Sequence, residues 1–417
     1  MEQQKAEDFF KQSRKASKAI ARLNSTEKAK LLTDLAELIE KEVEEIKVEN
    51  KKDLDRMETS DPKYDRLLLT DERIAALLNS LQTVAKLEDP VGKVLLEKTL
   101  PNGLKLSKIA DPLGVVGIIY ESRPNVTVDV ASLCLRSGNA AILKGGKEAH
   151  FSNTYLVSLI HEVLSNNGLP TEVVTLLPTD RSYTAALLNA EDYVDVIIPR
   201  GSAGLINYVR ENSLIPTIET GAGVCHTYVE KTGNPSMAAA ILVNAKVTRP
   251  SVCNSLDCAV LDEEVLETVI PQVLEGFKEY NVEVYADEKS YPVFEKNGYT
   301  KLKKASSEDF GKEWLDYKVS FKTVNGIDEA LEHIEENSSR HSEAIITENN
   351  DLAIKFIKEV DAASVYHNAS TRFTDGEEFG LGAEIGISTQ KLHARGPFAL
   401  EKLVTEKWVV LGTGQIR

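Results

Sequence analysis

Five near-continuous runs of apolar and β-branched residues, separated by helix-like segments, constrain the fold of this chain more than any other feature of its sequence. The runs lie at residues 113–120, 140–144, 173–177, 194–198 and 214–218. Strands that lack polar alternation are buried on both faces, which is typical of a parallel sheet with helices on either side. We therefore predict an α/β fold with a parallel sheet of the nucleotide-binding type, although the sequence contains no GxGxxG motif.

The other segments predict two domains and a separate pair of strands, since 417 residues are too many for one hydrophobic core. Apolar residues recur at helical spacing over most of the first 90 positions, and a second α/β block follows position 224. The second block has expected helices at residues 236–247 and 263–280, and expected strands at 282–286, 317–323, 344–347 and 364–367. We predict a cofactor domain at residues 1–93 and 112–223, a catalytic domain at 224–392 and a returning helix at 393–405.

Residues 94–108 alternate between apolar and polar side chains around an Asn102-Gly103 pair. This pattern predicts a β-hairpin closed by a two-residue type I′ turn, in which both central residues need a positive φ. An isolated hairpin is only marginally stable in water, and residues 407–416 predict a terminal strand that would pair with it. We expect the two segments, 94–111 and 406–417, to join subunits into a homodimer or homotetramer.

The charge and cysteine content limit the partners of the chain. Its 65 acidic and 49 basic residues give a net charge of -16, which disfavours nucleic acid and anionic membranes. No run of about 18 apolar residues occurs and the first residues are polar, so we expect a cytoplasmic protein without membrane helices. None of the four cysteines lies in a CxxC pair, and we expect neither a disulfide framework nor a metal site.

One cysteine, Cys253, lies in a polar turn between an alanine-rich helical segment and an apolar run. Most cysteines are small buried hydrophobic residues, but Pro250 and the flanking serine and asparagine favour a position outside the core. A thiol attacks only as the thiolate, which needs partial exposure and positive potential. Arg249 and the backbone N–H groups of the turn can supply that potential, which makes Cys253 a candidate nucleophile.

An acidic, glycine-rich loop, Glu219-Thr220-Gly221-Ala222-Gly223, precedes Cys253 by 253 minus 219, or 34, positions. With a parallel sheet before it, this order resembles the aldehyde dehydrogenase superfamily, in which a Glu-x-Gly-Gly loop precedes the catalytic cysteine. Four segments are similar to the γ-glutamyl phosphate reductases, also called glutamate-5-semialdehyde dehydrogenases, and the likeness covers nearly the whole chain. The segments are residues 120–129, 218–226, 249–254 and 378–388.

This resemblance implies an aldehyde-dehydrogenase-like fold, with a Rossmann-type cofactor domain, an α/β catalytic domain and a small β-hairpin for oligomerisation. It also implies reduction of L-glutamate 5-phosphate by NADPH to L-glutamate 5-semialdehyde and phosphate in L-proline biosynthesis, with functional coupling to the kinase that makes the substrate. Cys253 would attack the acyl phosphate to form a thioester, which hydride from NADPH then reduces. The alternatives are a hydrolytic NAD-dependent aldehyde dehydrogenase and a catalytically inactive NADP-binding scaffold.

The same resemblance implies catalytic roles for two further residues. Asn125 would donate its side-chain amide to the developing oxyanion, together with the backbone N–H of Cys253. Counting back without a gap from Ser137-Gly138-Asn139 instead places Glu121 at that position, and Asn125 would then only shape its loop. Glu219 would activate water in hydrolytic relatives, whereas in a reductase it would deprotonate Cys253 or hold its loop.

The cofactor is expected at the ends of two strands. Lys144 ends its strand before a Gly-Gly pair and resembles the superfamily lysine that reaches the adenosine ribose. Together with Lys147 it could pair with a 2′-phosphate, and the alternative is an ordinary surface charge. Gly201, Ser202 and Gly204 open a helix whose N–H groups can meet the pyrophosphate, or they only shape a turn.

The substrate is expected near two arginines and a late polar loop. Arg123 and Arg372 are candidate partners of its phosphate or α-carboxylate, because a guanidinium binds such oxyanions through two donors, or they are structural residues. The superfamily's Glu-x-Phe-Gly segment has no counterpart at the expected distance after Cys253, and Glu378 lies later in the chain. We therefore leave the nicotinamide-ribose role unassigned and expect residues 367–386 to hold substrate.

Overall fold

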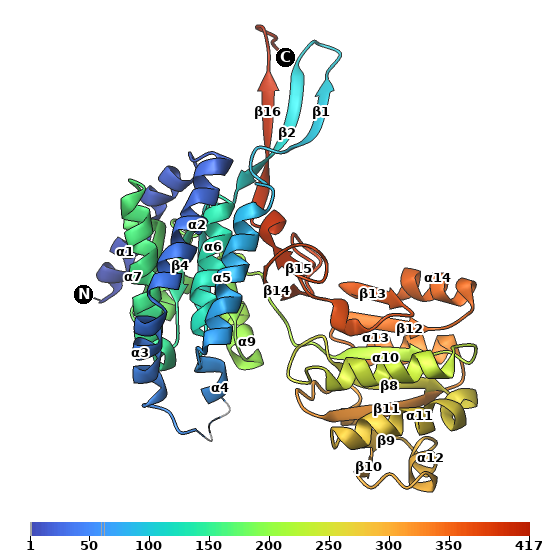
Figure 1. Ribbon diagram of the computed structural model, residues 1–417. Helices are drawn as coiled ribbons and strands as arrows, with labels where there is room; N and C mark the ends of the chain where they lie inside the picture. The colour runs from blue at the N-terminus through green and yellow to red at the C-terminus, as the bar shows by residue number, and fades with distance from the viewer. Residues whose placement is uncertain (1, 60, 62) are drawn as a thin grey trace. The chain divides into compact units, whose positions relative to one another are not determined.

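The structure is a computed structural model that describes residues 2–59, 61 and 63–417 (Figure 1). It divides into two compact units. The first unit contains Met1–Thr220, Gly380–Gly386 and Pro397–Arg417, and the second contains Gly221–Phe379 and Ile387–Gly396. Each unit has its own parallel sheet, which confirms the predicted α/β class.

Helices fill the part of the first unit that precedes its first strand, as the spacing of apolar residues predicts. They are α1 (Glu2–Ile20), α2 (Ser25–Lys41), α3 (Val43–Leu54), α4 (Tyr64–Leu67) and α5 (Asp71–Lys86). The start of α2 is fixed by a capping box, in which the side chain of Asn24 accepts from Glu27 N and the side chain of Glu27 accepts from Asn24 N. Thr70 caps α5 by accepting a hydrogen bond from Arg73 N at 3.2 Å.

The main sheet of the first unit is parallel throughout, with the strand order β5-β4-β3-β6. Its strands are β3 (Val115–Tyr120), β4 (Ala140–Lys144), β5 (Val174–Leu176) and β6 (Val196–Arg200), at four of the five predicted positions. The helices between and after them are α6 (Pro124–Arg136), α7 (His150–Asn166), α8 (Arg181–Leu188) and α9 (Ala203–Asn212). The chain runs outward from β3 to β5 and then crosses to β6 on the other side of β3. The loops after β3 and β6 therefore flank a topological switch point, where ligands of such sheets bind.

The fifth predicted strand, residues 214–218, is wrong. This segment contacts the sheet through an isolated bridge between Thr217 and Ile197, so it is not a full strand of the ladder. Ile197 N donates to Pro216 O, and Ile218 N donates to Ile197 O, both at 2.9 Å. Pro216 has no N–H group, so it interrupts the ladder that the apolar pattern suggested.

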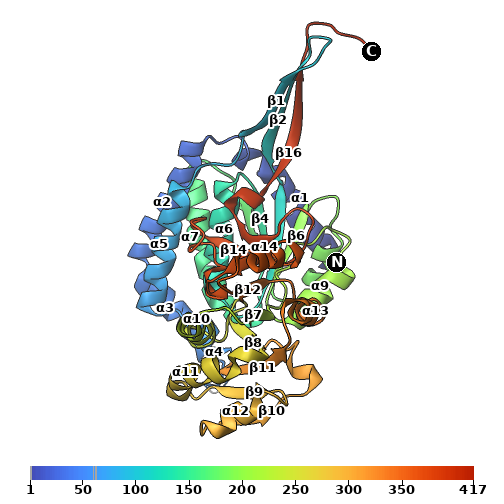
Figure 2. The same cartoon turned by 90° about the vertical axis from the view of Figure 1, so that its right-hand side faces the viewer.

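A three-stranded antiparallel sheet also belongs to the first unit and has the order β1-β2-β16. Its strands are β1 (Val94–Thr99), β2 (Lys105–Pro112) and β16 (Val404–Leu411), and Figures 1 and 2 show them extending away from the helices of this unit. Val404 pairs with Pro112 and Leu411 with Lys105, so β16 covers the whole of β2. The predicted hairpin and its pairing with a terminal strand are both confirmed.

The turn of this hairpin differs from the predicted type I′ form. Leu100 N donates to Leu104 O at 2.8 Å, which closes a three-residue loop, and only the last of its residues, Gly103, has a positive φ (84°). Pro101 begins the loop. Because its ring holds φ near -65°, it suits the second position of a type I turn and excludes the mirror-image turn.

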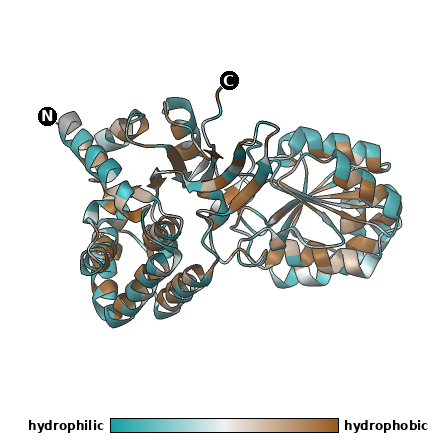
Figure 3. Cartoon of the chain, turned by 90° about the horizontal axis from the view of Figure 1, so that it is seen from above, coloured by the Kyte–Doolittle hydropathy of each residue, from teal (hydrophilic) through white to brown (hydrophobic). Residues whose placement is uncertain are grey.

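The sheet of the second unit is parallel and seven-stranded, with the order β10-β9-β11-β8-β7-β12-β13. Its strands are β7 (Cys225–Val229), β8 (Leu256–Asp262), β9 (Glu283–Ala286), β10 (Leu302–Lys304), β11 (Lys318–Val324), β12 (Ser342–Ile346) and β13 (Ser364–His367). The helices are α10 (Pro235–Val247), α11 (Leu266–Glu279), α12 (Tyr291–Lys296), α13 (Ile327–Asn337) and α14 (Asn350–Glu359). Figure 3 shows apolar strands between these helices, whose outer faces are largely polar. The predicted strands and helices of this block are confirmed to within a few residues.

The helix predicted to return at residues 393–405 is wrong. The segment instead contains β15 (Gly396–Ala399), which pairs with β14 (Glu384–Ser388), and a short 3-10 turn, η6 (Leu400–Lys402). Gly396 has a φ of 84°, and the proline after it disfavours helical geometry at the preceding residue. In the described part of the chain, no helix combines the length and apolar character needed to cross a membrane.

Candidate active site

Cys253 lies in the turn between α10 and β8, just before the amino end of β8. It is half-buried, whereas Cys134, Cys225 and Cys258 are fully buried, and all four are free thiols. A nucleophilic cysteine needs this partial exposure, because burial in apolar surroundings suppresses the thiolate. Of the four cysteines, Cys253 therefore has the exposure that the predicted nucleophile requires.

Asn254, the residue after Cys253, fixes the turn to a later loop. Its side chain is 3% exposed, and Nδ2 donates to the carbonyl oxygens of Thr374 at 2.9 Å and Arg372 at 3.2 Å. Thr371 Oγ1 donates to Asn254 O at 2.8 Å, and the guanidinium of Arg372 donates to Asn254 Oδ1. Four hydrogen bonds therefore hold Asn254, and the backbone of Cys253 with it.

Two guanidinium groups lie within electrostatic range of this turn. Burial lowers the pKa of Arg372 and the like charge of Arg249 lowers it further, whereas Asp375 and Cys253 raise it. The last effect is mutual, so the same guanidinium favours the thiolate of Cys253. Arg372 Nε is buried and makes no hydrogen bond within the described residues.

The backbone of Cys253 packs against the glycine loop that precedes β7. A side chain at position 223 would overlap the carbonyl oxygen of Cys253, so only glycine fits there. Gly223 N donates to Glu313 Oε1 at 2.8 Å, and burial raises the pKa of that carboxyl group. Cys225 Sγ donates to Cys253 O at 3.2 Å, and burial raises the pKa of this thiol well above its usual value. Cys225 therefore acts as a protonated donor that supports the turn.

In the first unit, Glu121 and Ser202 meet at the switch point of the parallel sheet. Glu121 accepts hydrogen bonds from Ser202 N at 2.9 Å and from Ser202 Oγ at 3.1 Å. Ser202 is the N-cap of α9, so the carboxylate occupies the helix N-terminus that the sequence predicts for pyrophosphate. A Cβ at Gly201 would lie 2.7 Å from Glu121 Oε2, so glycine permits this approach. An anion bound at α9 would have to replace the Glu121 side chain.

Lys144 ends β4, and its side chain is buried. Its Nζ donates to Thr179 O at 3.2 Å and to Gly145 O at 3.3 Å. Burial lowers the pKa of Lys144, while Asp180 and Glu148 raise it. An ammonium group has three N–H donors, so one donor of Lys144 remains beyond these two hydrogen bonds.

The remaining predicted residues of the first unit lie on separate elements. Asn125 is in the first turn of α6, where Nδ2 donates to Asp129 Oδ2 at 2.9 Å, and Arg123 is the N-cap residue of that helix. Lys147 begins the 3-10 turn η1 (Lys147–Ala149), and Gly204 lies in the first turn of α9. Glu219 Oε2 lies 3.7 Å from Arg210 Nη1. The structure thus places Glu121 at the N-terminus of α9, whereas the amide of Asn125 is paired within α6.

Three contributors to the cysteine turn were not predicted from the sequence, namely Asn254, Thr371 and Glu313. Asn254 follows Cys253 directly, but its partner Thr374 is 120 positions away, and nothing local indicates that pairing. Glu313 meets Gly223 across 90 positions in the same way. Arg372 was predicted as a substrate ligand, and the structure places it beside the cysteine turn.

Comparison with known proteins gives the family. The chain matches the family model "Aldehyde dehydrogenase family" over residues 1–312. The solved structure of a gamma-glutamyl phosphate reductase from Thermotoga maritima is similar with a TM-score of 0.94 and 40% identity, covering 98% of this chain and 99% of that chain. An acetylating aldehyde dehydrogenase from Geobacillus thermoglucosidasius shares the fold, with a TM-score of 0.72 at 16% identity over 100% of this chain and 98% of that chain.

Curated relatives of similar length indicate a particular group within this family. The gamma-glutamyl phosphate reductase of Legionella pneumophila (strain Corby) is 53% identical over 98% of this chain and 99% of its own length. That of Bacteroides thetaiotaomicron is 53% identical over 96% of each chain. The chain therefore belongs to the aldehyde dehydrogenase family and, within it, to the group of gamma-glutamyl phosphate reductases, which are oxidoreductases.

Proposed function

We propose that the chain catalyses the NADPH-dependent reduction of L-glutamate 5-phosphate to L-glutamate 5-semialdehyde and phosphate, in L-proline biosynthesis. The observation that carries this proposal is the half-buried thiol of Cys253 within electrostatic range of the Arg372 guanidinium, which in turn interacts with the charge of Arg249. An acyl phosphate is both electrophilic and anionic, so it needs a nucleophile and cations in one place. The names of the relatives at 53% identity support this choice of substrate.

In the first step, the thiolate of Cys253 attacks the acyl carbon and the bond from that carbon to the phosphate oxygen breaks. Phosphate leaves with the bonding electrons, and the cysteine carries a glutamyl thioester. The guanidinium groups of Arg372 and Arg249 are the proposed partners of the departing phosphate, since a guanidinium offers charge and two donors to such an anion. Serine in place of Cys253 would form a less electrophilic ester and be harder to activate.

Negative charge develops on the carbonyl oxygen in both steps, and donors placed there lower the barrier. The backbone N–H of Cys253 and the side-chain amide of Asn125 are the proposed donors, and one such donor contributes about 2.7–4 kcal/mol. Cys225 donates to the Cys253 carbonyl oxygen, and the missing side chain of Gly223 lets that carbonyl group approach the glycine loop, so both residues support the turn that carries Cys253.

NADPH, when bound, supplies the hydride that reduces the thioester carbonyl to the aldehyde. The sulfur of Cys253 then leaves the carbon with its electron pair, and the thiolate is restored. Lys144 and Lys147 are proposed to bind the ribose and its 2′-phosphate, on the basis of the buried ammonium group at the end of β4. Gly201, Ser202 and Gly204 are proposed to meet the pyrophosphate at α9 once the Glu121 side chain has moved aside.

Two charged residues complete the proposal. Arg123 has an exposed side chain at the start of α6 and is the proposed partner of the substrate α-carboxylate. Glu219 is proposed to hold its loop or to accept the thiol proton. Attack of water on the thioester would waste the substrate, so a water-activating role is not needed in this direction. The contact of Glu219 with Arg210 supports the holding role.

A homo-oligomer, either a dimer or a tetramer, is part of the same proposal. Large apolar side chains on the β1-β2-β16 sheet are exposed, and a strand edge with such residues readily pairs with another chain. These side chains are Val94, Leu95, Leu96, Trp408, Val410 and Leu411. We further propose a cytoplasmic location and functional coupling to the kinase that makes the labile acyl phosphate. Light scattering on a Trp408→Lys variant tests the oligomer, because the added charge should reduce the number of subunits.

The thioester is the feature that a single experiment can test most sharply. The protein is mixed, without NADPH, with L-glutamate 5-phosphate that its kinase produces in the same solution. It should rapidly release one phosphate per chain and gain a glutamyl adduct on Cys253, detected by mass spectrometry. Cys253→Ala should show neither, while Cys134→Ser, a buried cysteine of the first unit, should behave as the parent. In the reverse direction, oxidation of glutamate semialdehyde by NADP should require phosphate. Phosphate-independent oxidation would identify the hydrolytic alternative instead.

A further inference from the structure

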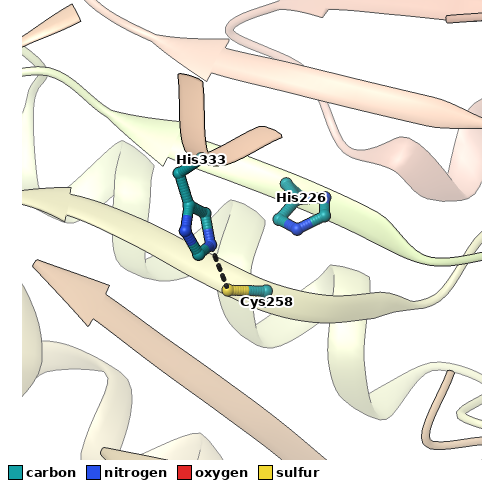
Figure 4. A group of neighbouring side chains, drawn as sticks. All are labelled: His226, Cys258 and His333. Atoms are coloured by element: carbon teal, nitrogen blue, oxygen red, sulfur yellow. Dashed lines mark hydrogen bonds between the residues drawn. The ribbon is translucent and has the colours of Figure 1, made fainter. Parts of the chain in front are cut away.

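Three side chains of metal-ligating type converge in the core of the second unit, and the mechanism uses none of them. His226 lies on β7, Cys258 on β8 and His333 on α13, and Figure 4 shows them grouped together. One ligand atom from each lies within 4.8 Å of the others. The first two side chains are completely buried, and His333 is 8% exposed. Because the three residues are far apart in the sequence, neither a CxxC pair nor any other local spacing indicates this cluster.

The distances within the cluster are close to those of a metal site. Cys258 Sγ lies 3.7 Å from His333 Nε2. Zinc bonds of about 2.3 Å to sulfur and about 2.0–2.1 Å to nitrogen place these two atoms roughly 3.5–3.8 Å apart at tetrahedral to trigonal angles. The longest separation in the cluster, up to 4.8 Å, requires a side-chain shift of roughly 1–1.5 Å from bound geometry.

His226 provides an independent reason to expect a ligand. Its Nε2 makes no hydrogen bond within the described residues, and its Nδ1 lies near a carboxylate oxygen without hydrogen-bond geometry, although the side chain is fully buried. Buried polar atoms are nearly always satisfied, and an orphaned imidazole nitrogen costs about 1–3 kcal/mol. A cation bound at this ring would remove that cost. The contact between Cys258 and His333, by contrast, would be satisfied as an ordinary thiol–imidazole hydrogen bond without any metal.

The surroundings of His226 match those of a metal-bound histidine. Its Nδ1 lies 3.2 Å from Glu343 Oε2, and both side chains are fully buried. Glu343 is held in place, because it accepts hydrogen bonds from His226 N at 2.8 Å and from Ser338 Oγ. Histidines that bind metals commonly present the other ring nitrogen to a carboxylate in this way, which fixes the tautomer. Glu343 beside Nδ1 therefore leaves Nε2 of His226 for the metal.

We propose that His226, Cys258 and His333 bind one Zn²⁺ ion in the core of the second unit, with Glu343 as the carboxylate behind His226. Binding of Zn²⁺ would displace the proton of the Cys258 thiol, and the resulting thiolate together with Glu343 would offset the charge of the divalent cation. Imidazole and thiolate are the ligands that zinc prefers, and a water molecule can complete four-coordination. The ion would join β7 and β8 to α13. Because the amino ends of β7 and β8 adjoin the Cys253 turn, the role would be structural support of the strands beneath that turn.

Metal content and cobalt spectroscopy test this proposal without an activity assay. Full-length protein is purified from zinc-supplemented cells and dialysed against a chelator. It should then retain about one zinc ion per chain, measured by inductively coupled plasma mass spectrometry. Cys258→Ala and His333→Gln should retain at least ten-fold less, while Cys134→Ser, an equally buried cysteine, should match the parent. Protein grown with cobalt should show a near-ultraviolet thiolate-to-cobalt band that survives in Cys253→Ser and disappears in Cys258→Ala.

Two outcomes would contradict the zinc site. Folded parent protein without zinc after zinc-supplemented growth, or with equimolar copper in its place, would overturn the zinc assignment. A cobalt band that persists in Cys258→Ala would place the metal at another cysteine and refute the site. If one of the two variants fails to fold, the other decides the location of the metal, and folded parent protein without zinc overturns the proposal in either case.

Discussion

Arg372 donates a hydrogen bond from its guanidinium to the side-chain oxygen of Asn254, the residue that follows the candidate nucleophile. The same arginine carries a charge that interacts with Cys253, so one side chain both holds the turn and favours the thiolate. Replacing it should therefore damage catalysis and thiol reactivity together.

For Arg372→Ala, we expect kcat/KM to fall about 100-fold, since a charged hydrogen bond of roughly 1.5–3 kcal/mol and a cation near the sulfur are both lost. Alkylation of Cys253 by iodoacetamide at neutral pH should slow about ten-fold. Arg372→Lys should restore much of the alkylation rate but little of kcat/KM, because lysine keeps the charge and loses the planar fork. Arg340→Ala, which removes a surface partner of Asp361, is the matched control. Unchanged alkylation in Arg372→Ala would contradict the electrostatic role.

Gly223→Ala should destabilise the second unit by at least about 3 kcal/mol, because the new methyl group would overlap the carbonyl oxygen of Cys253. Urea unfolding measures this change. Gly204→Ala is the control, since its nearest neighbour would be Ser202 Oγ at 4.0 Å, and alanine should leave α9 equally or slightly more stable. Equal stability of the two variants would show that the loop can move away from the cysteine.

His341 should make the second unit sensitive to acid. Burial lowers its pKa to about 4 from the ordinary value of 6.5. The unfolded chain therefore binds a proton more readily than the folded chain between these values, and stability is lost as the pH falls from about 6.5 to 4. At 1.36 kcal/mol per unit, this group accounts for about 3 kcal/mol. His341→Asn should lose correspondingly less stability than the parent between pH 7 and pH 4, measured by urea unfolding. An identical loss in both proteins would refute the assignment.

Glu121→Gln should strengthen cofactor binding, because the carboxylate at the N-terminus of α9 competes with the pyrophosphate proposed for that place. Removing a charge worth about 1 kcal/mol at a helix terminus corresponds to a roughly five-fold lower KM for NADPH. Glu211→Gln, at the other end of the same helix, should leave KM unchanged. A higher KM in Glu121→Gln would mean that the carboxylate itself assists the cofactor.

The sequence predicted what local patterns control. The continuous apolar runs identified β3 to β6, and the alternation of apolar and polar residues identified the hairpin. Both predictions succeeded because the burial of a strand determines the apolar pattern of its consecutive residues. The errors arose where one residue overrides such a pattern, as Pro216 and Pro101 do. The candidate site was predicted less completely. Cys253 and Arg249 were predicted from their own turn and Arg372 as a substrate ligand, whereas contacts such as Asn254 with Thr374 depend on pairing across 120 positions. The His226 cluster was missed for the same reason.

The pairing of β16 with β2 affects how the chain folds during its synthesis on the ribosome. β2 lies within the first 112 residues, yet its partner is completed only at Leu411, so the hairpin edge stays uncovered throughout most of translation. An uncovered apolar edge is a template for intermolecular association. Nascent chains and products truncated before residue 404 should therefore be the species most dependent on chaperones.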